Sequence, residues 1–588
     1  DAVARRMGAG PRTNGPPAMK PGRGRLRRLS ARLGPPLLFA ALPVLTVASA
    51  NPARVSLVEV LPVLGWAMAA VAGLWAALYV LSGRSSEASL LTIVVLVWVS
   101  AFGHVEDVML AVFPRTPGTL QLVGAWSILG LWAAWVVHRR SDGELRPVLS
   151  VAAAVGAGAV VVALVPLARG AAAGLGADYS PFGERGGLAA SPARAASGEK
   201  RDVYFIVPDR YASDDVLARY FDYDNRSFTD ELRRRGFFVA DASLANYLRT
   251  AHSLAAALNL EYVRRPSAAG PGGGGSYAPL FRAIARSRVA TVLKEHGYEY
   301  HHLGSWWKGS SRARPADYDY MREEDPWCSG VARVLVQNSV AGRALAALDR
   351  AVCGTRERQR RRLEAKLRLL VEIAGRPERT FTFAHLLIPH EPFVFAADGR
   401  PLSEADVSGR PWRELYLGQL EYLNRRLLEV VDAIHRRSPI EPIIVIQADE
   451  GPFSYSGELA VSPFDWCGAA PDTAYRKFGI LSAVSLPGAD PPALWPELSP
   501  VNTLRLVLRH HFGYDLPPLP DRSFVFPMDG RTYDFMDVTG VLRTVQSRPG
   551  PGSLPERLCP DVPEEEIRSG HRGVAVPFPI WRDVDARD

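Results

Sequence analysis

Three short apolar runs of this sequence are each followed directly by side chains that can bind a metal or move a proton. Run 202–207 is followed by Asp209, run 380–388 by His390, and run 442–447 by Asp449 and Glu450. Such runs predict buried strands, and the carboxyl ends of parallel strands meet at the sheet edge where ligands bind. Three carboxylates gathered there repel one another unless they are protonated or share a cation. The pattern therefore predicts a site for one divalent ion held by Asp209, Asp449 and Glu450.

A threonine supplies a candidate nucleophile beside this site. Thr250 opens 250–260, a strong helix-forming stretch, and a hydroxyl at a helix N-terminus lies in a positive potential that favours an alkoxide and a phosphate. A metal ligated by Thr250 would lower the pKa of that hydroxyl further. Oxygen ligands favour Mg²⁺ or Mn²⁺, whereas a histidine ligand shifts the preference toward Zn²⁺. Individually, such a threonine is more often a helix cap and such an aspartate a turn residue, so the hypothesis depends on their joint placement.

The elements that must position these residues alternate along the C-terminal part of the chain. The predicted strands at 202–207, 380–388 and 442–447 are separated by predicted helices at 228–235, 250–260 and 416–435. This alternation predicts an α/β fold with a mainly parallel sheet. Trp307 and Lys308 follow a further strand near 298–303 and are candidate substrate contacts. His302 and His385 could also line the site, although a hydrogen-bonded core histidine is the commoner role.

The N-terminal part is apolar and predicts an all-α membrane domain. Five stretches approach the roughly 20 residues of a spanning helix, at 35–50, 56–82, 88–112, 119–138 and 147–167. The first is short, and a cleaved signal peptide is its alternative. At 588 residues the chain is long enough for several domains. We expect a basic cytoplasmic tail at 1–34, a membrane domain at 35–167, a linker at 168–200, a catalytic domain at 201–545 and a C-terminal tail at 546–588.

Charge and cysteine placement predict the topology. Residues 1–34 hold nine Lys or Arg against Asp1, which equals the formal net charge of +8 of the whole chain, so no basic face for nucleic acid is expected. Basic residues also follow the second and fourth stretches, at Arg84, Arg139, Arg140 and Arg146. The positive-inside rule then places the N-terminus in the cytoplasm and, after five crossings, residue 168 onward outside. The first residue is Asp, and Met7 is one candidate start.

All four cysteines lie in the portion expected outside the membrane, where the compartment is oxidising. We expect two disulfides there, Cys328–Cys353 and Cys467–Cys559 by sequence proximity, with the other two pairings left open.

Several motifs, in order, resemble a known superfamily. They are DVYFIVPDRYASDDVL, FTDELRRRGFFVADASLANYLRTAHSLAAALN, HLLIPHEPFVF, IIVIQADEGP and LSPVNTLRLVLRHHFG. Over about residues 201–530 the chain resembles the sulfatase-like branch of the alkaline phosphatase superfamily. The most similar group is the bacterial membrane-bound enzymes related to lipoteichoic acid synthase and phosphoethanolamine transferases. This resemblance implies a three-layer α/β sandwich outside the bacterial cytoplasmic (inner) membrane.

The resemblance also implies roles for single residues. Asp209 matches the first metal carboxylate, and Thr250 matches the threonine nucleophile. Ser253, three residues later as in the family, is a candidate substrate contact. Asp449-Glu450-Gly451 matches a late Asp-His-Gly metal motif, in which Glu450 departs from the usual histidine. His390 matches a substrate-contacting histidine. The nucleophile position reads Thr-Ala-His-Ser-Leu, which excludes the formylglycine route to sulfate esters.

Together these features predict a metal-dependent phosphoryl-group transferase that forms an adduct on Thr250. The expected donor is a phospholipid or another lipid-linked phosphodiester, and the expected acceptor is an envelope glycan or polymer. The cofactor is expected to be one divalent ion, Mn²⁺ or Mg²⁺ before Zn²⁺. Two alternatives remain open at this stage: a phosphodiesterase in which water resolves the adduct, and a binding protein whose Glu450 has weakened its metal site.

Overall fold

The computed structural model describes most of the chain and divides it into two compact units. The described residues are 21–50, 57–112, 119–175, 181–182, 200–264, 277–320, 330–340, 342, 355–453, 465–488, 494–527, 531–548 and 555–559. One unit comprises Asp1–Arg169 and Ser329–Ala347, and the other comprises Gly170–Cys328 and Leu348–Asp588. The chain therefore leaves the second unit after Cys328 and returns to it at Leu348.

The first unit is helical. Its described helices are α1 (Pro21–Ala50), α2 (Leu57–Ser82), α3 (Ser85–Ser100), α4 (Phe102–Val112), α5 (Thr119–Arg139), α6 (Asp142–Leu175) and α12 (Gly330–Gln337). Four of them, α1, α2, α5 and α6, contain apolar segments long enough to cross a membrane. The helix α1 starts at Pro21, so residues 21–34, expected to belong to the basic tail, are helical. Residues 1–20 lie outside the described part of the chain.

The basic segments of this unit lie together at one end of it. The Arg84 guanidinium donates hydrogen bonds to the carbonyl oxygens of His138 and Arg140, at 3.3 and 2.9 Å. The hydroxyl of Ser89 donates to the carbonyl of Arg32 at 2.6 Å. The start of the apolar part of α1, the turn between α2 and α3, and the turn between α5 and α6 therefore share one end.

The third apolar stretch, 88–112, is not one helix but two, α3 and α4, and a distant segment fills the break. In an unbroken helix the N–H of Gly103 would donate to the carbonyl of Val99. Here that N–H donates to the carbonyl of Asn338 at 3.0 Å, and the N–H of Val340 donates to the carbonyl of Val99 at 2.9 Å. A Cβ on Gly103 would lie 2.9 Å from the Cα of Asn338, so only glycine allows this approach.

The second unit is built on a seven-stranded sheet in the order β2-β7-β6-β1-β5-β3-β4. The strands are β1 (Val203–Pro208), β2 (Phe238–Val239), β3 (Glu299–Leu303), β4 (Tyr318–Asp319), β5 (Thr380–Leu386), β6 (Ile443–Gln447) and β7 (Ser482–Ser485). Strands β6, β1, β5, β3 and β4 run parallel, while β7 is antiparallel to β6 and to β2. The predicted, mainly parallel sheet is confirmed, with β1, β5 and β6 at its centre.

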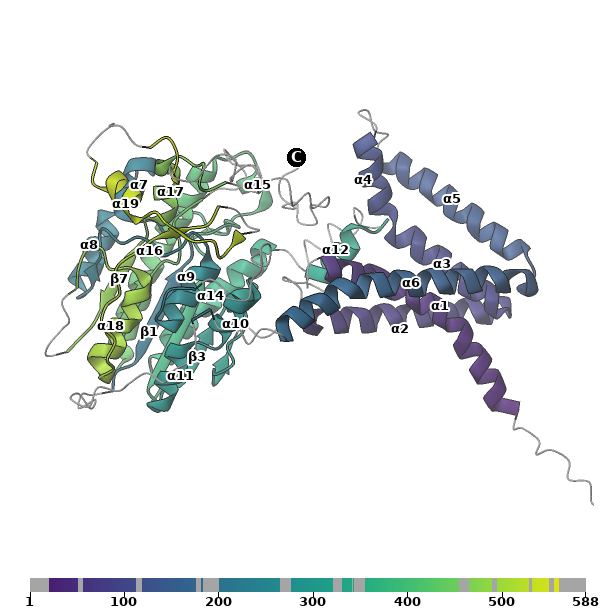
Figure 1. Cartoon of the computed structure of the whole chain (residues 1–588), viewed down its shortest axis with the longest axis horizontal. Helices are drawn as coiled ribbons and strands as arrows, with labels where there is room; N and C mark the ends of the chain where they lie inside the picture. The colour runs from purple at the N-terminus through teal and green to yellow at the C-terminus, as the bar shows by residue number, and fades with distance from the viewer. Residues whose placement is uncertain are drawn as a thin grey trace, which may run out of the picture. The chain divides into compact units, whose positions relative to one another are not determined.

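Helices cover both faces of this sheet (Figure 1). One layer includes α7 (Asp214–Phe221), α8 (Arg226–Arg234), α14 (Thr355–Ile373), α16 (Trp412–Arg437) and α17 (Pro471–Phe478); the other includes α9 (Thr250–Asn259), α10 (Ala278–Ala285), α11 (Arg288–Glu295) and α18 (Pro500–Phe512). Side chains of β1 alternate between the layers, since Tyr204 and Ile206 join the first core while Val203 and Phe205 join the second. The predicted three-layer α/β sandwich is confirmed.

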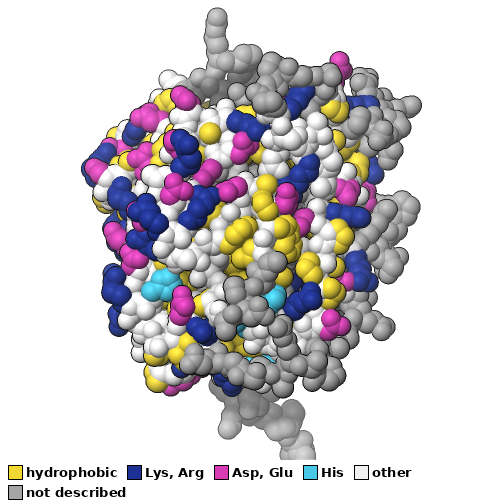
Figure 2. Space-filling model, turned by 90° about the vertical axis from the view of Figure 1, so that its left-hand side faces the viewer, with side chains coloured by type: hydrophobic (Ala, Val, Ile, Leu, Met, Phe, Trp, Pro, Cys, Tyr) yellow, Lys and Arg dark blue, Asp and Glu magenta, His cyan; other side chains and the backbone are white. Residues whose placement is uncertain are grey.

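Charged side chains of both signs are mixed on the surface. The face drawn in Figure 2 carries Lys and Arg side chains interspersed with Asp and Glu side chains. The whole sequence has 69 basic against 61 acidic residues. The net positive charge thus resides in the N-terminal segment and not in a basic field on the face shown.

One predicted disulfide joins the late part of the second unit to its core. Cys467 and Cys559 are bonded, with their Cα atoms 4.7 Å apart, and the N–H of Cys559 donates to the carbonyl of Cys467 at 3.1 Å. This pairing is confirmed. Cys328 and Cys353 lie outside the described residues.

Candidate metal and phosphoryl-transfer site

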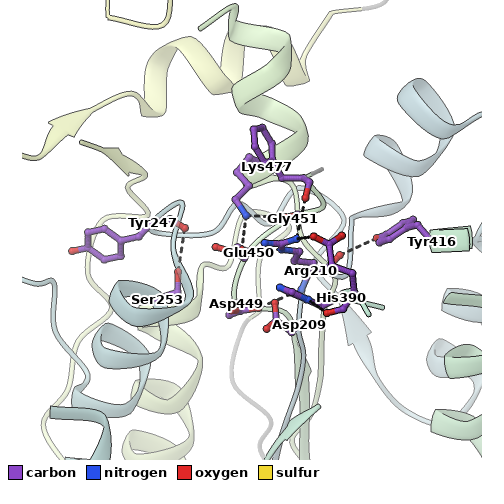
Figure 3. Close-up of polar contacts among 12 residues, drawn as sticks. Asp209, Arg210, Tyr247, Ser253, His390, Tyr416, Asp449, Glu450, Gly451 and Lys477 are labelled. Atoms are coloured by element: carbon purple, nitrogen blue, oxygen red, sulfur yellow. Dashed lines mark hydrogen bonds and ion pairs between the residues drawn. The ribbon is translucent and has the colours of Figure 1, made fainter. Parts of the chain in front are cut away.

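Three metal-binding side chains converge at the carboxyl ends of the three central strands. Asp209 follows β1 directly, Asp449 follows β6 by two residues, and His385 lies near the end of β5. One ligand atom from each lies within 4.8 Å of the other two, and all three residues are buried. Figure 3 shows Asp209 and Asp449 side by side below Glu450. The sheet edge predicted from the sequence therefore does bring together two of the predicted carboxylates.

The polar atoms of this group suit a cation. Among the described residues, Oδ1 of Asp209, Oδ2 of Asp449 and Nε2 of His385 are buried without a hydrogen-bond partner. A buried polar atom left unpaired costs about 1–3 kcal/mol, so a cation bound by this group would relieve that cost for all three residues. Two carboxylates and one imidazole form a donor set that fits Mn²⁺ or Zn²⁺.

A neighbouring turn fixes the orientation of His385. Its Nδ1 lies 2.7 Å from the hydroxyl of Ser310, in the short helix η1 (Lys308–Ser310), and its Nε2 lies 3.4 Å from Oδ2 of Asp209. A proton on Nδ1 donated to Ser310 leaves Nε2 free to act as a ligand. Burial lowers the pKa of His385, which favours this neutral, ligating form.

The two carboxyl groups do not share their charge equally. Burial, followed by the charges of Asp209 and Glu450, raises the pKa of Asp449 well above its ordinary value. Burial opposes the charged form of Asp209 too, but its interactions with His390, His385 and Arg210 outweigh burial and hold its pKa below the usual range. A divalent cation between the two groups would allow both to ionise.

Thr250 reaches the same place from α9. It is the first residue of that helix, whose N-cap is Arg249, so Thr250 is not the cap. Its side chain lies near enough to the Asp449 carboxyl to favour the charged form of that group and so to oppose the rise of its pKa. The hydroxyl of Ser253 instead donates to the carbonyl of Tyr247 at 3.1 Å (Figure 3), so the substrate contact predicted for Ser253 stays a prediction.

Glu450 is held by two cationic side chains. Its Oε1 lies 2.5 Å from Nζ of Lys477 and 3.3 Å from Nε of Arg210 (Figure 3). Its Oε2 is buried and has no hydrogen-bond partner among the described residues. The metal-ligand role predicted for Glu450 therefore stays a prediction that would have to use Oε2.

The other predicted substrate residues border this group. The N–H of His390 donates to the carbonyl of Asp209 at 3.3 Å. The ring of Trp307 lies 6.0 Å from that of His385 and is nearly perpendicular to it, at 78°. Lys308 begins the same short helix that holds Ser310. Trp307 and Lys308 therefore lie near His385. Their contact with substrate stays a prediction.

Three residues of this constellation were not assigned from the sequence: His385 as a ligand, Arg210 and Lys477. His385 lies in the predicted strand 380–388, and in the sheet it is paired with Val207 of β1, two residues before Asp209. Its place near the end of a central strand could have indicated a ligand. Arg210 adopts a left-handed backbone with φ of 63°, which no sequence pattern announced. Lys477 lies 27 residues beyond Glu450, on α17, and has no recognisable spacing.

Comparisons with known proteins give similarities of fold. No family model and no curated protein matches the sequence. Among solved structures, the C-terminal periplasmic domain of EcEptC from Escherichia coli is 9% identical and covers 58% of this chain and 93% of its own, with a TM-score of 0.36. A protein in the alkaline phosphatase superfamily from Vibrio parahaemolyticus is 14% identical, with 58% and 76% coverage and a TM-score of 0.32. The C-terminal periplasmic domain of phosphoethanolamine transferase EptC from Campylobacter jejuni is 11% identical, with 53% and 90% coverage and a TM-score of 0.29. Function is therefore assigned from the side chains of the site.

Proposed function

We propose that this chain is a membrane-anchored, metal-dependent phosphoryl-group transferase that works through an adduct on Thr250. The observation that carries the proposal is the position of Thr250, at the first turn of α9 and beside the carboxyl of Asp449, which belongs to the group of side chains that could hold a metal. A hydroxyl, a helix N-terminus and a cation site in one place form the combination that phosphoryl transfer requires.

The metal would be held by Asp209, Asp449 and His385. When bound, a divalent cation lowers the pKa of a nearby hydroxyl and neutralises phosphate charge. The residues of the chain then position the nucleophile and the phosphate. Asp449 lies beside Thr250, the positive end of the α9 dipole would favour the developing negative charge, and His390 would hydrogen-bond the phosphate.

The reaction would proceed in two displacements. In the first, Oγ of Thr250 bonds to phosphorus, the bond from phosphorus to the donor's alcohol oxygen breaks, and the hydroxyl proton passes to the departing alcohol. In the second, an acceptor hydroxyl bonds to phosphorus and the bond from phosphorus to Thr250 breaks. The acceptor's proton returns to Oγ, so the enzyme is regenerated.

The helical unit supports a lipid-linked donor and an outward-facing site. Four apolar helices long enough to span a membrane belong to it, and its basic turns lie at one end with Arg32. Under the positive-inside rule that end faces the cytoplasm, and α6 leads away from it toward the second unit. We therefore place the transferase in the bacterial cytoplasmic membrane, acting on an envelope glycan or polymer with a phospholipid as donor.

Turnover of a chromogenic phosphodiester by the purified full-length protein with Mn²⁺ tests this function. Thr250→Ala is expected to reduce kcat by at least about a thousandfold, because it removes the group that forms the intermediate, and Thr250→Ser should retain activity. Thr291→Ala, on a partly exposed face of α11, is the matched control and should leave turnover unchanged. Full turnover by Thr250→Ala would refute the proposal.

A further inference from the structure

The buried ion pair of Glu450 and Lys477 determines how many cations this site holds. We propose that Lys477 is the internal counter-ion of Glu450 that keeps this carboxylate out of the metal-ligand set, so that the site takes one divalent ion through Asp209, Asp449 and His385. This inference rests on the proposed metal-dependent function and goes beyond it, because it assigns a metal-limiting role to Lys477.

Lys477 is fully buried, so water cannot solvate its ammonium group. Its Nζ lies 2.5 Å from Oε1 of Glu450 and 3.4 Å from the carbonyl of Gly451, and 5.7 Å from the ring centre of Phe453. A buried ammonium without a partner is strongly destabilising, so Lys477 requires a carboxylate at this position.

The backbone holds the two chain segments of the pair together. The N–H of Gly451 donates to the carbonyl of Lys477 at 2.8 Å, so the segment after β6 lies against the last turn of α17. A Cβ on Gly451 would lie 2.3 Å from the carbonyl oxygen of Arg476, so only glycine permits this approach. The backbone of Lys477 is therefore fixed beside the segment that carries Glu450.

The ion pairs of the site leave the charge for one divalent ion. Its carboxylates are those of Asp209, Glu391, Asp449 and Glu450, its paired cations are Arg210 and Lys477, and the charge of Arg249 also acts on Lys477. Lys477 compensates Glu450, and Nη1 of Arg210, at 3.3 Å, compensates Glu391. The two negative charges that remain belong to Asp209 and Asp449, which lie with His385 around the unpaired ligand atoms. One divalent cation completes this balance, and a second would leave an excess of positive charge.

The alternative role for Lys477, as a group that orients Glu450 toward the metal, predicts the opposite change in metal affinity when the lysine is removed. If Lys477 oriented Glu450 as a true ligand, then removal of the lysine would weaken metal binding, as for other groups that position a ligand. If Lys477 neutralises Glu450, then its removal leaves an additional negative charge beside the metal and strengthens binding. The two roles also predict different metal affinities for the double variant E450Q/K477Q. If Lys477 neutralises Glu450, the variant loses only a neutral pair and keeps its affinity. If Glu450 is a ligand, the variant loses that ligand and binds the metal more weakly.

Mn²⁺ binding to the metal-free, full-length protein in detergent, measured by equilibrium dialysis and elemental analysis, tests the proposal. The wild type is expected to bind one Mn²⁺ per chain. We expect K477Q to bind it about tenfold more tightly or better and E450Q about tenfold more weakly, since a charge within a few ångströms has effects of this size. The double variant E450Q/K477Q, which leaves no unpaired buried charge and should fold, is expected to return to within about threefold of the wild-type affinity.

Lys294→Gln is the matched control for charge, because Lys294 pairs with Asp317 at the surface and should leave Mn²⁺ affinity unchanged. Weaker binding by K477Q, or an affinity of the double variant reduced tenfold or more, would overturn the inference. This failure is distinct from failure of the proposed function, which would appear as one bound Mn²⁺ without any dependence of turnover on Thr250.

Discussion

Nε2 of His385 lies 3.4 Å from Oδ2 of Asp209, and both side chains are buried at the ends of neighbouring parallel strands. We expect His385→Ala to lower the affinity for Zn²⁺ or Mn²⁺ by more than about a hundredfold, because it removes one of three ligand side chains. Ser310→Ala, which removes only the partner of Nδ1, is expected to cost about 10–100-fold. Equilibrium dialysis against each ion measures both effects.

His302→Gln is the control for loss of a buried histidine. His302 lies on β3, and its Nδ1 bonds to Asp319 at 3.0 Å, away from the metal-binding group. The variant should retain metal affinity. Equal losses in His385→Ala and His302→Gln would show that the effect comes from disruption of the core and not from loss of a ligand.

The raised pKa of Asp449 predicts how the metal-free protein responds to pH. The unfolded chain releases this proton near pH 3.9, whereas the folded protein holds it to higher pH because of burial and the charges of Asp209 and Glu450. Ionisation of Asp449 therefore costs stability as the pH rises above about 4. We expect Asp449→Asn to stabilise the chelator-treated protein at pH 8 relative to the wild type, because the amide carries no charge to bury. Thermal unfolding between pH 4 and 8 should show this difference vanish toward pH 4.

An aspartate with the opposite shift provides the comparison. Hydrogen bonds from Arg226 lower the pKa of the exposed Asp224 to about 2, so its charged form is favoured in the folded protein. Asp224→Asn should therefore destabilise slightly at neutral pH. If both variants changed stability in the same direction, the assigned cause of the Asp449 shift would be wrong.

The break between α3 and α4 predicts a requirement for glycine at position 103. Gly103→Val would push its side chain against the backbone of Asn338, whose Cα would lie 2.9 Å from the new Cβ. We expect residues 338–340 to separate from the break, so that the N–H of Val340 loses its partner on Val99. Hydrogen–deuterium exchange of the peptide containing Val340 should become markedly faster.

Gly73→Val, in α2, is the matched control, because a Cβ there meets no atom within 4 Å. It should leave exchange at Val340 unchanged. Unaltered protection of Val340 in Gly103→Val would contradict the proposed role of this contact.

Much of the fold followed from short-range patterns. The apolar runs that became β1, β5 and β6 are buried on both faces, so nearly every residue in them had to be hydrophobic. The third apolar stretch was harder, because its break depends on Asn338 and Val340, more than 200 residues away, and its glycine looks like any other in the sequence.

The site was predictable where chemistry follows a strand end. Asp209 and Asp449 sit one and two residues beyond their strands, and Thr250 begins its helix as expected. Lys477 was not predictable, because only the tertiary contact between Gly451 and the end of α17 brings it to Glu450. His385 looked like a core histidine since it lies within a strand, and only the unpaired Nε2 distinguishes it.

Mass spectrometry of the protein isolated from its native membrane under mild, metal-depleted conditions that slow turnover tests the central claim most directly. Peptide mapping is expected to find a fraction of Thr250 carrying a phosphoryl or substituted phosphoryl group, whose mass identifies the transferred moiety. Ser253, three residues away with its hydroxyl bonded to Tyr247, should remain unmodified. A persistently unmodified Thr250 in a protein that turns over a phosphodiester would contradict the account.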